Sequence, residues 1–208
     1  MPQEINYLKQ TASQTAGPYV HIGLIPQQAG FDIFANNFSN VLVSEGTVGE
    51  RIRLEGRVFD GSGAVVKDAL VEIWQANASG HYAHSADRQG KAADPEFRGF
   101  GRAGSDFETG VFFFDTVKPG MVTGRNASPM APHINLWIVA RGINTGLHTR
   151  AYFSDESAAN AADPVLNLVE AVERRKTLVA QRSVRDGGTV YIFDVHLQGA
   201  HETVFFDV

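Results

Sequence analysis

The sequence has no cysteine among its 208 residues, which excludes disulfide bonds and any metal site built on thiolates. It also has no stretch that approaches the roughly 18 to 20 consecutive apolar residues of a membrane-spanning helix. Positive charge is scarce as well, because 18 lysine and arginine residues face 23 aspartate and glutamate residues, so the basic footprint of a nucleic-acid-binding protein is missing. The N-terminus has neither the basic start nor the apolar core of a signal peptide, and we therefore expect a cytoplasmic protein.

What the chain does have is enough apolar sequence, 43% of its residues, to bury a core, and its length suits one domain over residues 1–208. In RIRLEGRVF, residues 51–59, charged side chains alternate with small or apolar ones, which is the period of a half-buried strand. Similar runs lie at 69–76, 110–117, 134–141, 148–153, 189–199 and 202–208. Glycine- and aspartate-containing turns separate the runs, so the pattern predicts an all-β protein with an antiparallel β-sandwich.

Two segments depart from this pattern. Residues 163–175 combine a capping residue, Asp163, with Pro164 at the first helical position and apolar residues at helical spacing, so they predict a short helix packed on the sandwich. Residues 1–50 show no sustained period, and we interpret them as a long irregular N-terminal arm of the kind that serves an interface or a site.

The familiar catalytic and cofactor motifs are missing. The sequence contains no G-x-S-x-G elbow, no Walker-type phosphate loop and no helix-borne zinc motif. The letters GFGRAG at 99–104 match a dinucleotide-binding fingerprint in spelling alone, because no helix is expected after them, and we interpret them as a plain loop.

Three residues could carry chemistry, and each has an ordinary alternative. On a strand His133 and position 135 share one face, so a second histidine there would offer two imidazoles to one metal ion, but position 135 is asparagine. His133 is more readily explained as a partly buried imidazole bonded to a backbone carbonyl, and this explanation applies still better to His148. Arg141, between a strand and the loop GINTG, could bind a carboxylate through two hydrogen bonds or could be solvated.

Residues 54–82 (LEGRVFDGSGAVVKDALVEIWQANASGHY) resemble the signature stretch of the intradiol ring-cleavage dioxygenases in the spacing of their glycine and apolar residues. The flanking blocks SQTAGPYVHIG, TVKPG, APHI, ARGIN, LHTR, DPVLNL and ETVFFD resemble the protocatechuate 3,4-dioxygenases, above all their alpha chains. The resemblance runs from about residue 13 to the C-terminus, and it implies a β-sandwich of the intradiol dioxygenase type.

The resemblance also bears on a metal site. Catalytic chains of that family hold a non-haem ferric ion with two tyrosinates and two histidines, and the matching positions here are Gln89, Val122, His133 and Asn135. An arginine that lies close to the metal in those chains is matched by Met130. Because ferric iron is a hard cation whose charge is balanced by anionic oxygen donors, the resemblance implies that this chain holds no metal and that the four positions are relics.

The same resemblance implies a partner and a substrate. In that family an alpha chain pairs with a homologous beta chain, which holds the Fe(III), and alpha-beta pairs build higher assemblies. Alpha-chain residues form part of the wall of the beta-chain site, and the matching residues here are Thr15, Gly17, Pro18 and Arg141. The chain alone is then inactive, with no catalytic residue of its own. The implied reaction inserts O2 into protocatechuate (3,4-dihydroxybenzoate) and gives 3-carboxy-cis,cis-muconate, a step of aromatic catabolism in the beta-ketoadipate pathway, with Arg141 on the substrate carboxylate.

Two other interpretations compete with this one. A non-catalytic β-sandwich module that binds or assembles with a partner would also suit a fold with a long arm. A lone enzyme could use another metal bound by His133, His148 and a carboxylate, although the spacing matches no ligand set that we can defend.

Overall fold

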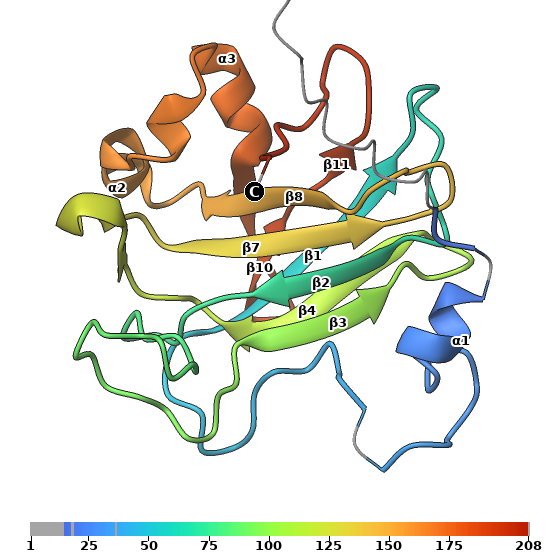
Figure 1. Ribbon diagram of the computed structural model, residues 1–208, viewed down its shortest axis with the longest axis horizontal. Helices are drawn as coiled ribbons and strands as arrows, with labels where there is room; N and C mark the ends of the chain where they lie inside the picture. The colour runs from blue at the N-terminus through green and yellow to red at the C-terminus, as the bar shows by residue number, and fades with distance from the viewer. Residues whose placement is uncertain (1–14, 18, 36, 208) are drawn as a thin grey trace, which may run out of the picture.

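The structure, a computed structural model, describes residues 15–17, 19–35 and 37–207. Figure 1 shows strands in two layers, with α2 and α3 at one end and α1 at the opposite corner. The strands are β1 (Arg51–Phe59), β2 (Leu70–Trp74), β3 (Phe100–Gly104), β4 (Val111–Val117), β5 (Val122–Thr123), β6 (Pro129–Met130), β7 (His133–Val139), β8 (Leu147–Phe153), β9 (Val179–Arg185), β10 (Gly188–Ile192) and β11 (Val195–His196). The helices are α1 (Val20–Leu24), α2 (Ser157–Ala162) and α3 (Val172–Arg175), with the 3-10 turns η1 (Arg125–Ala127), η2 (Leu166–Leu168) and η3 (Lys176–Leu178). None of the described helices is both long and apolar enough to cross a membrane.

The strands form a sandwich because one continuous sheet folds over on itself. Its order is β11-β1-β10-β9-β8-β7-β2-β3, with β4 on the other side of β1. The strand β9 joins the two layers, since its first two residues pair with β8 and the rest pair with β10. One hydrophobic cluster contains side chains from both layers, such as Leu54, Phe112 and Tyr191 on one side and Ile73 and Leu136 on the other. The predicted β-sandwich is confirmed.

The pairing is mixed rather than purely antiparallel. Among the described strands six pairings are antiparallel, whereas β1–β10, β1–β11 and β8–β9 are parallel. Strand β1 shows why the sequence pattern worked: Ile52, Leu54 and Val58 point into the core while charged residues alternate with them. Gly56 takes a core position without a side chain because a Cβ there would lie 1.9 Å from the carbonyl oxygen of Phe193.

Two of the expected segments need correction, and one strand was missed. The stretch 99–104 is not a loop, because residues 100–104 form strand β3 at the edge of the sheet. The expected strand at 202–208 is wrong over its described residues, which make a single bridge, between His148 and Phe206. Strand β9 was not predicted, since most of its side chains are exposed or half-buried and it lacks the alternation that marks a strand.

The expected continuous helix over 163–175 is replaced by two separate short elements, η2 and α3. Asp163 is fully buried, and its Oδ1 accepts the backbone N–H of Val165 (2.9 Å) and of Leu166 (2.7 Å), so it starts the turn η2 instead of a longer helix. The backbone then becomes extended at Val169, which separates the two elements. Leu168 is consequently 74% exposed, although helical spacing had placed it on a buried face.

The described part of the N-terminal arm crosses the edge strand β3. The Gln28 side chain accepts the N–H of Gly104 at 3.0 Å and donates to the carbonyl oxygens of Gly104 and Ser105, so it pairs with the open edge as a neighbouring strand would. A Cβ on Gly101 would lie 2.5 Å from Leu42, and a Cβ on Gly104 would lie 2.4 Å from Ile25. Gly101 and Gly104, two of the three glycines of GFGRAG, therefore make room for the arm.

Candidate functional site

The arm meets the loop between β7 and β8 at Arg141. The hydroxyl of Thr15 donates to the carbonyl oxygen of Ala140 (3.3 Å) and accepts the N–H of Gly142 (2.9 Å), so its two hydrogen bonds lie on either side of Arg141 in the sequence. Two of the expected substrate-binding residues, Thr15 and Arg141, are thus brought together from positions 126 residues apart. Thr15 holds the arm and the loop in a fixed relation.

The guanidinium of Arg141 is oriented from one side. Its Nε donates to the carboxylate of Asp68, which precedes β2. The side chain of Asp68 is 18% exposed and that of Arg141 is 64% exposed, so the carboxylate is the fixed member of the pair. Within the described residues the two terminal nitrogens of Arg141 have no hydrogen-bond acceptor, and they are the pair of donors that binds a carboxylate in two-point fashion.

The other two arm residues add less. Gly17 is exposed, and a Cβ on it would meet no atom of this chain within 4 Å, so nothing within the described chain requires glycine there. Its carbonyl oxygen accepts the N–H of Val20 (3.2 Å) at the start of α1. Pro18 lies outside the described residues.

His133 and Asn135 lie on one face of β7, as the alternation predicts. The register places His133 opposite Tyr152 and Asn135 opposite Arg150. His133 is only 2% exposed, and its Nδ1 lies 2.7 Å from the carbonyl oxygen of Ala131, while its Nε2 has no partner in the described chain. Burial, and secondarily the charge of Arg150, lowers the pKa of His133 to about 4, so the imidazole is neutral at pH 7.

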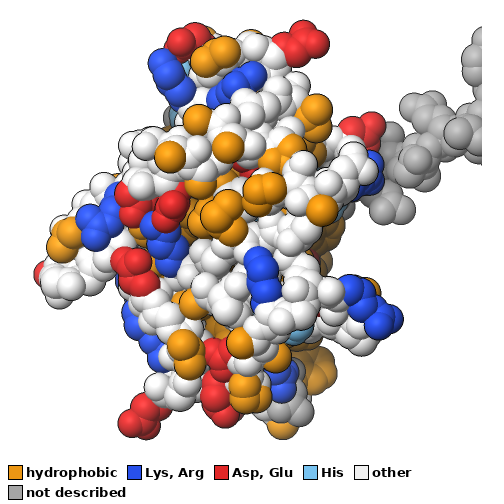
Figure 2. Space-filling model, turned by 90° about the vertical axis from the view of Figure 1, so that its left-hand side faces the viewer, with side chains coloured by type: hydrophobic (Ala, Val, Ile, Leu, Met, Phe, Trp, Pro, Cys, Tyr) orange, Lys and Arg blue, Asp and Glu red, His pale blue; other side chains and the backbone are white. Residues whose placement is uncertain are grey.

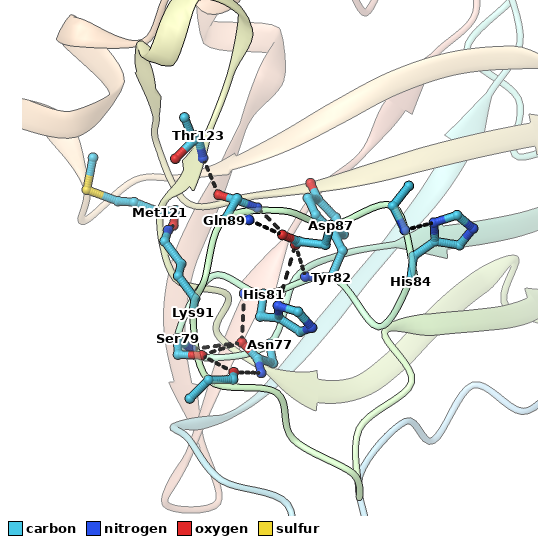
Figure 3. Close-up of polar contacts among 12 residues, drawn as sticks. Asn77, Ser79, His81, Tyr82, His84, Asp87, Gln89, Lys91, Met121 and Thr123 are labelled. Atoms are coloured by element: carbon cyan, nitrogen blue, oxygen red, sulfur yellow. Dashed lines mark hydrogen bonds and ion pairs between the residues drawn. The ribbon is translucent and has the colours of Figure 1, made fainter.

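Gln89, at the first matched tyrosinate position, uses its side-chain amide for hydrogen bonds within this chain. Its Nε2 donates to Asp87 (3.0 Å) and its Oε1 accepts the N–H of Thr123 (2.5 Å), which ties the loop after β2 to strand β5. Figure 3 shows Gln89 between Asp87 and Thr123. Both ends of the amide are therefore occupied.

The remaining matched positions offer no anionic oxygen. Val122 is buried and pairs with Met130 across β5 and β6, and Asn135 donates its Nδ2 to the carbonyl oxygen of Trp74 (3.1 Å). The four positions together supply one uncommitted imidazole nitrogen and no phenolate or carboxylate. This set does not fit ferric iron, which requires anionic oxygen donors.

Other metal arrangements find no support in the geometry. The described residues contain no group of three histidine, aspartate or glutamate side chains placed to hold a metal ion. His148 shares a face with His133, but it lies opposite Trp137, four residues along β7, which corresponds to about 13 Å. A site that combines the two histidines is therefore contradicted by the register.

Arg141 is far from the relic positions of its own chain. His133 begins β7 and Val139 ends it, so about 20 Å separates the two, and Arg141 lies beyond Val139. Arg141 and Thr15 therefore face a different region from the one that contains His133 and Asn135. A ligand bound at Arg141 would not reach these positions in the same chain.

Sequence reasoning did not identify Asp68 and Arg150 as site residues. Asp68 is a turn residue between two runs, and only the folded loop shows that it holds the Nε of Arg141. Arg150 stands in an ordinary alternating strand, and its place beside Asn135 depends on a register that the sequence does not encode locally.

Comparison with known proteins gives consistent matches. The family model described as "Dioxygenase" matches residues 35–199. The chain is 48% identical over 207 residues, 100% of both chains, to the protocatechuate 3,4-dioxygenase alpha chain of Pseudomonas putida. It is 35% identical over 162 residues, 75% of this chain and 68% of the relative, to the protocatechuate 3,4-dioxygenase beta chain of Burkholderia cepacia. A solved dioxygenase domain from Streptomyces sp. SirexAA-E has a TM-score of 0.56 at 24% identity over 92% of this chain and 100% of its own, which supports the fold.

Proposed function

The chain belongs to the intradiol dioxygenase family, and on that premise we propose that it is the iron-free alpha chain of an enzyme that cleaves the ring of protocatechuate. A homologous beta chain holds the non-haem Fe(III) and completes the active site together with this chain. The full-length similarity to an alpha chain and the weaker similarity to a beta chain support an enzyme of two homologous chains. The reaction adds both atoms of O2 to 3,4-dihydroxybenzoate between the two hydroxylated carbons and yields 3-carboxy-cis,cis-muconate.

The position of Arg141 is the observation that carries the proposal. Its terminal nitrogens are exposed and without an acceptor in the described chain, and it lies more than about 20 Å from His133. An oriented guanidinium at that place suits a ligand bound mainly by another chain. In this proposal Thr15, Gly17, Pro18 and Arg141 form the part of the pocket wall that this chain contributes.

The chemical role of Arg141 follows from the substrate. Protocatechuate carries a carboxylate on the side of the ring away from its two hydroxyl groups, and a guanidinium that grips this carboxylate through two hydrogen bonds fixes the orientation of the ring. The iron in the beta chain supplies the activation of the catechol. This chain supplies binding and orientation, and it moves no proton.

Two further expectations belong to the same proposal. We propose that residues 1–208 act as one domain with the arm at 1–50, and the single large core cluster, which runs from Ile52 to Val195, supports this. We also propose that the enzyme works in the cytoplasm, where aromatic acids taken up by the cell would meet it.

The test is the substitution Arg141→Ala in the assembled two-chain enzyme. Loss of a charge-assisted hydrogen-bond pair should raise KM for protocatechuate about ten- to a hundredfold, whereas KM for catechol, which has no carboxylate, should change little. Arg174→Ala is a matched control, because Arg174 is also an exposed arginine in an ion pair, with Glu202, but belongs to the helix α3. Equal losses for the two substrates would show that Arg141 does not bind the carboxylate.

The alternative function is a non-catalytic β-sandwich module that binds a partner. The observation that favours it is the set of exposed aromatic side chains on the arm, including Phe31, Phe34 and Phe38. Co-expression with the tyrosine- and histidine-bearing sibling chain separates the two functions. An alpha chain yields oxygen uptake with protocatechuate only in that pair, whereas a module requires no such partner.

A further inference from the structure

A groove on the outer face of the sheet, separate from Arg141, has the features of a binding site. It encloses about 810 Å³ over strands β2, β7 and β8 and is flanked by η1 and η2. Trp74, Asn135 and Arg150 form a row across the three strands, since Asn135 pairs with Trp74 on one side and with Arg150 on the other. Neighbouring strands are about 4.8 Å apart, so the row spans about 10 Å, which is the length of a small aromatic acid.

Arg150 is the partly buried cation of this groove, and none of the ion pairs of the described chain involves it. Its Nη1 lies 3.6 Å from the sulfur of Met130, and its guanidinium lies 6.0 Å from the ring centre of Phe206. Along the described chain no carboxylate lies within ion-pair distance of Arg150, although it is only partly exposed. A half-buried charge without a counter-ion is energetically unfavourable, and a bound carboxylate would remove that cost.

The other charged groups of the groove leave Arg150 available. Glu72 is taken by Arg102, at 2.6 Å. Arg125 and Asp207 are exposed and line the groove with opposite charges. The buried imidazole of His133 makes its only described hydrogen bond to the carbonyl oxygen of Ala131 and does not line the groove. Arg150 is thus the one partly buried positive charge that lines the groove among the described residues.

The walls of the groove are aromatic and apolar. Trp74 and Trp137 come from adjacent strands of the sheet, and Phe206, Met130 and Leu168 add apolar surface from the segments around it. Figure 2 shows the end of the molecule that lies on the left in Figure 1, where hydrophobic side chains lie among charged ones. A flat apolar ring with one negative charge matches this arrangement better than a bare inorganic anion does.

We propose that the groove binds a small aromatic carboxylate, with the carboxylate on Arg150 and the ring against the two tryptophans. The ligand class resembles the substrate of the proposed reaction. The groove includes the matched positions Met130 and Asn135 but not Arg141, and its described lining comes from this chain. The occupancy of such a site would rise with the concentration of aromatic acids. The proposal therefore stands or falls separately from the proposed function.

The chain contains its own reporter for the test. Trp74 and Trp137 are its two tryptophans, so the tryptophan fluorescence of the purified full chain reports on this groove. Titration with benzoate should give saturable quenching. Benzamide, which has the same shape but no charge, and acetate, which has the charge but no ring, should each bind at least about tenfold more weakly, because each lacks one of the two contacts.

Variants of the chain test whether Arg150 is the residue that binds the carboxylate. Arg150→Gln should weaken benzoate binding at least about tenfold, whereas the surface control Arg174→Ala should leave the titration unchanged. If Arg150→Gln fails to fold, the comparison of benzoate with benzamide in the unmodified chain still decides the matter. Equal binding of benzoate and benzamide, absence of saturation at millimolar benzoate, or equal binding of benzoate and acetate would overturn the proposal.

Discussion

The carboxylate of Asp68 accepts a hydrogen bond from the Nε of Arg141 and thereby fixes the plane of the guanidinium, while the two terminal nitrogens stay exposed. This relationship turns a flexible surface arginine into an oriented pair of donors. Rotamer entropy is lost when the ion pair forms rather than when a ligand binds, so a ligand bound at the terminal nitrogens gains affinity from the pair.

Asp68→Asn should therefore weaken substrate binding without abolishing it. The amide keeps a neutral acceptor for the Nε hydrogen but loses the charge, so KM for protocatechuate in the assembled enzyme should rise about two- to fivefold, less than with Arg141→Ala. Asp186→Asn is the matched control, since Asp186 is an exposed aspartate at the β9–β10 turn with a positive φ of 52°, which asparagine also tolerates. A KM as high as that of Arg141→Ala would mean that Asp68 itself contacts the substrate.

Thr15 should matter through its hydroxyl group. Thr15→Val keeps the shape of the side chain but removes both hydrogen bonds that join the arm to the loop around Arg141, and about 1 kcal/mol of lost positioning would raise KM for protocatechuate about fivefold. Thr15→Ser retains the hydroxyl group and should behave like the parent chain. Steady-state kinetics of the two variants side by side measure the difference, and equal KM values would remove Thr15 from the site.

His133 should make the stability of the chain depend on pH in a defined window. Burial lowers its pKa to about 4, against 6.5 for an ordinary histidine, so the unfolded chain takes up the proton first as the pH falls. The contribution of His133 to the free energy of unfolding is complete above pH 6.5, declines between pH 6.5 and about 4, and is lost below that range. The whole change amounts to about 3 kcal/mol at most.

The measurement is denaturant unfolding at several pH values for the parent chain and for His133→Gln, which cannot titrate. The difference between the two free energies of unfolding should shrink as the pH falls from 6.5 to about 4, while other acidic groups affect both chains alike. Parallel curves across that window would show that His133 titrates normally in the folded chain.

The sandwich was predictable because a half-buried strand reveals itself locally. The alternation in β1 gave its bounds correctly, Arg51–Phe59, since every second side chain meets the same core. The edge strand β3 was not predicted, because its glycines make room for the arm that crosses it and do not follow the alternation of a strand that packs on the core. The helix over 163–175 failed because a buried carboxylate, Asp163, takes the N–H groups of Val165 and Leu166. Both failures come from long-range contacts or a buried polar group, which the periodicity of the sequence does not reveal.

The candidate site was likewise predictable in part. The geometry agrees with the expected proximity of Thr15 and Arg141, whose role in substrate binding stays a prediction. Asp68 became visible only with the fold, because an ion pair between residues 73 positions apart leaves no local trace in the sequence. The types of side chain that could act at the site were predictable from the sequence, whereas the spatial arrangement of those side chains was not.

The most direct test of the central claim is metal analysis and oxygen uptake with the chain purified alone and then together with the homologous beta chain. The account predicts no stoichiometric iron and no uptake with protocatechuate for the chain alone, and iron with full uptake for the pair. Stoichiometric ferric iron in the chain alone, with a tyrosinate-to-metal absorption band and unaided consumption of protocatechuate, would contradict it.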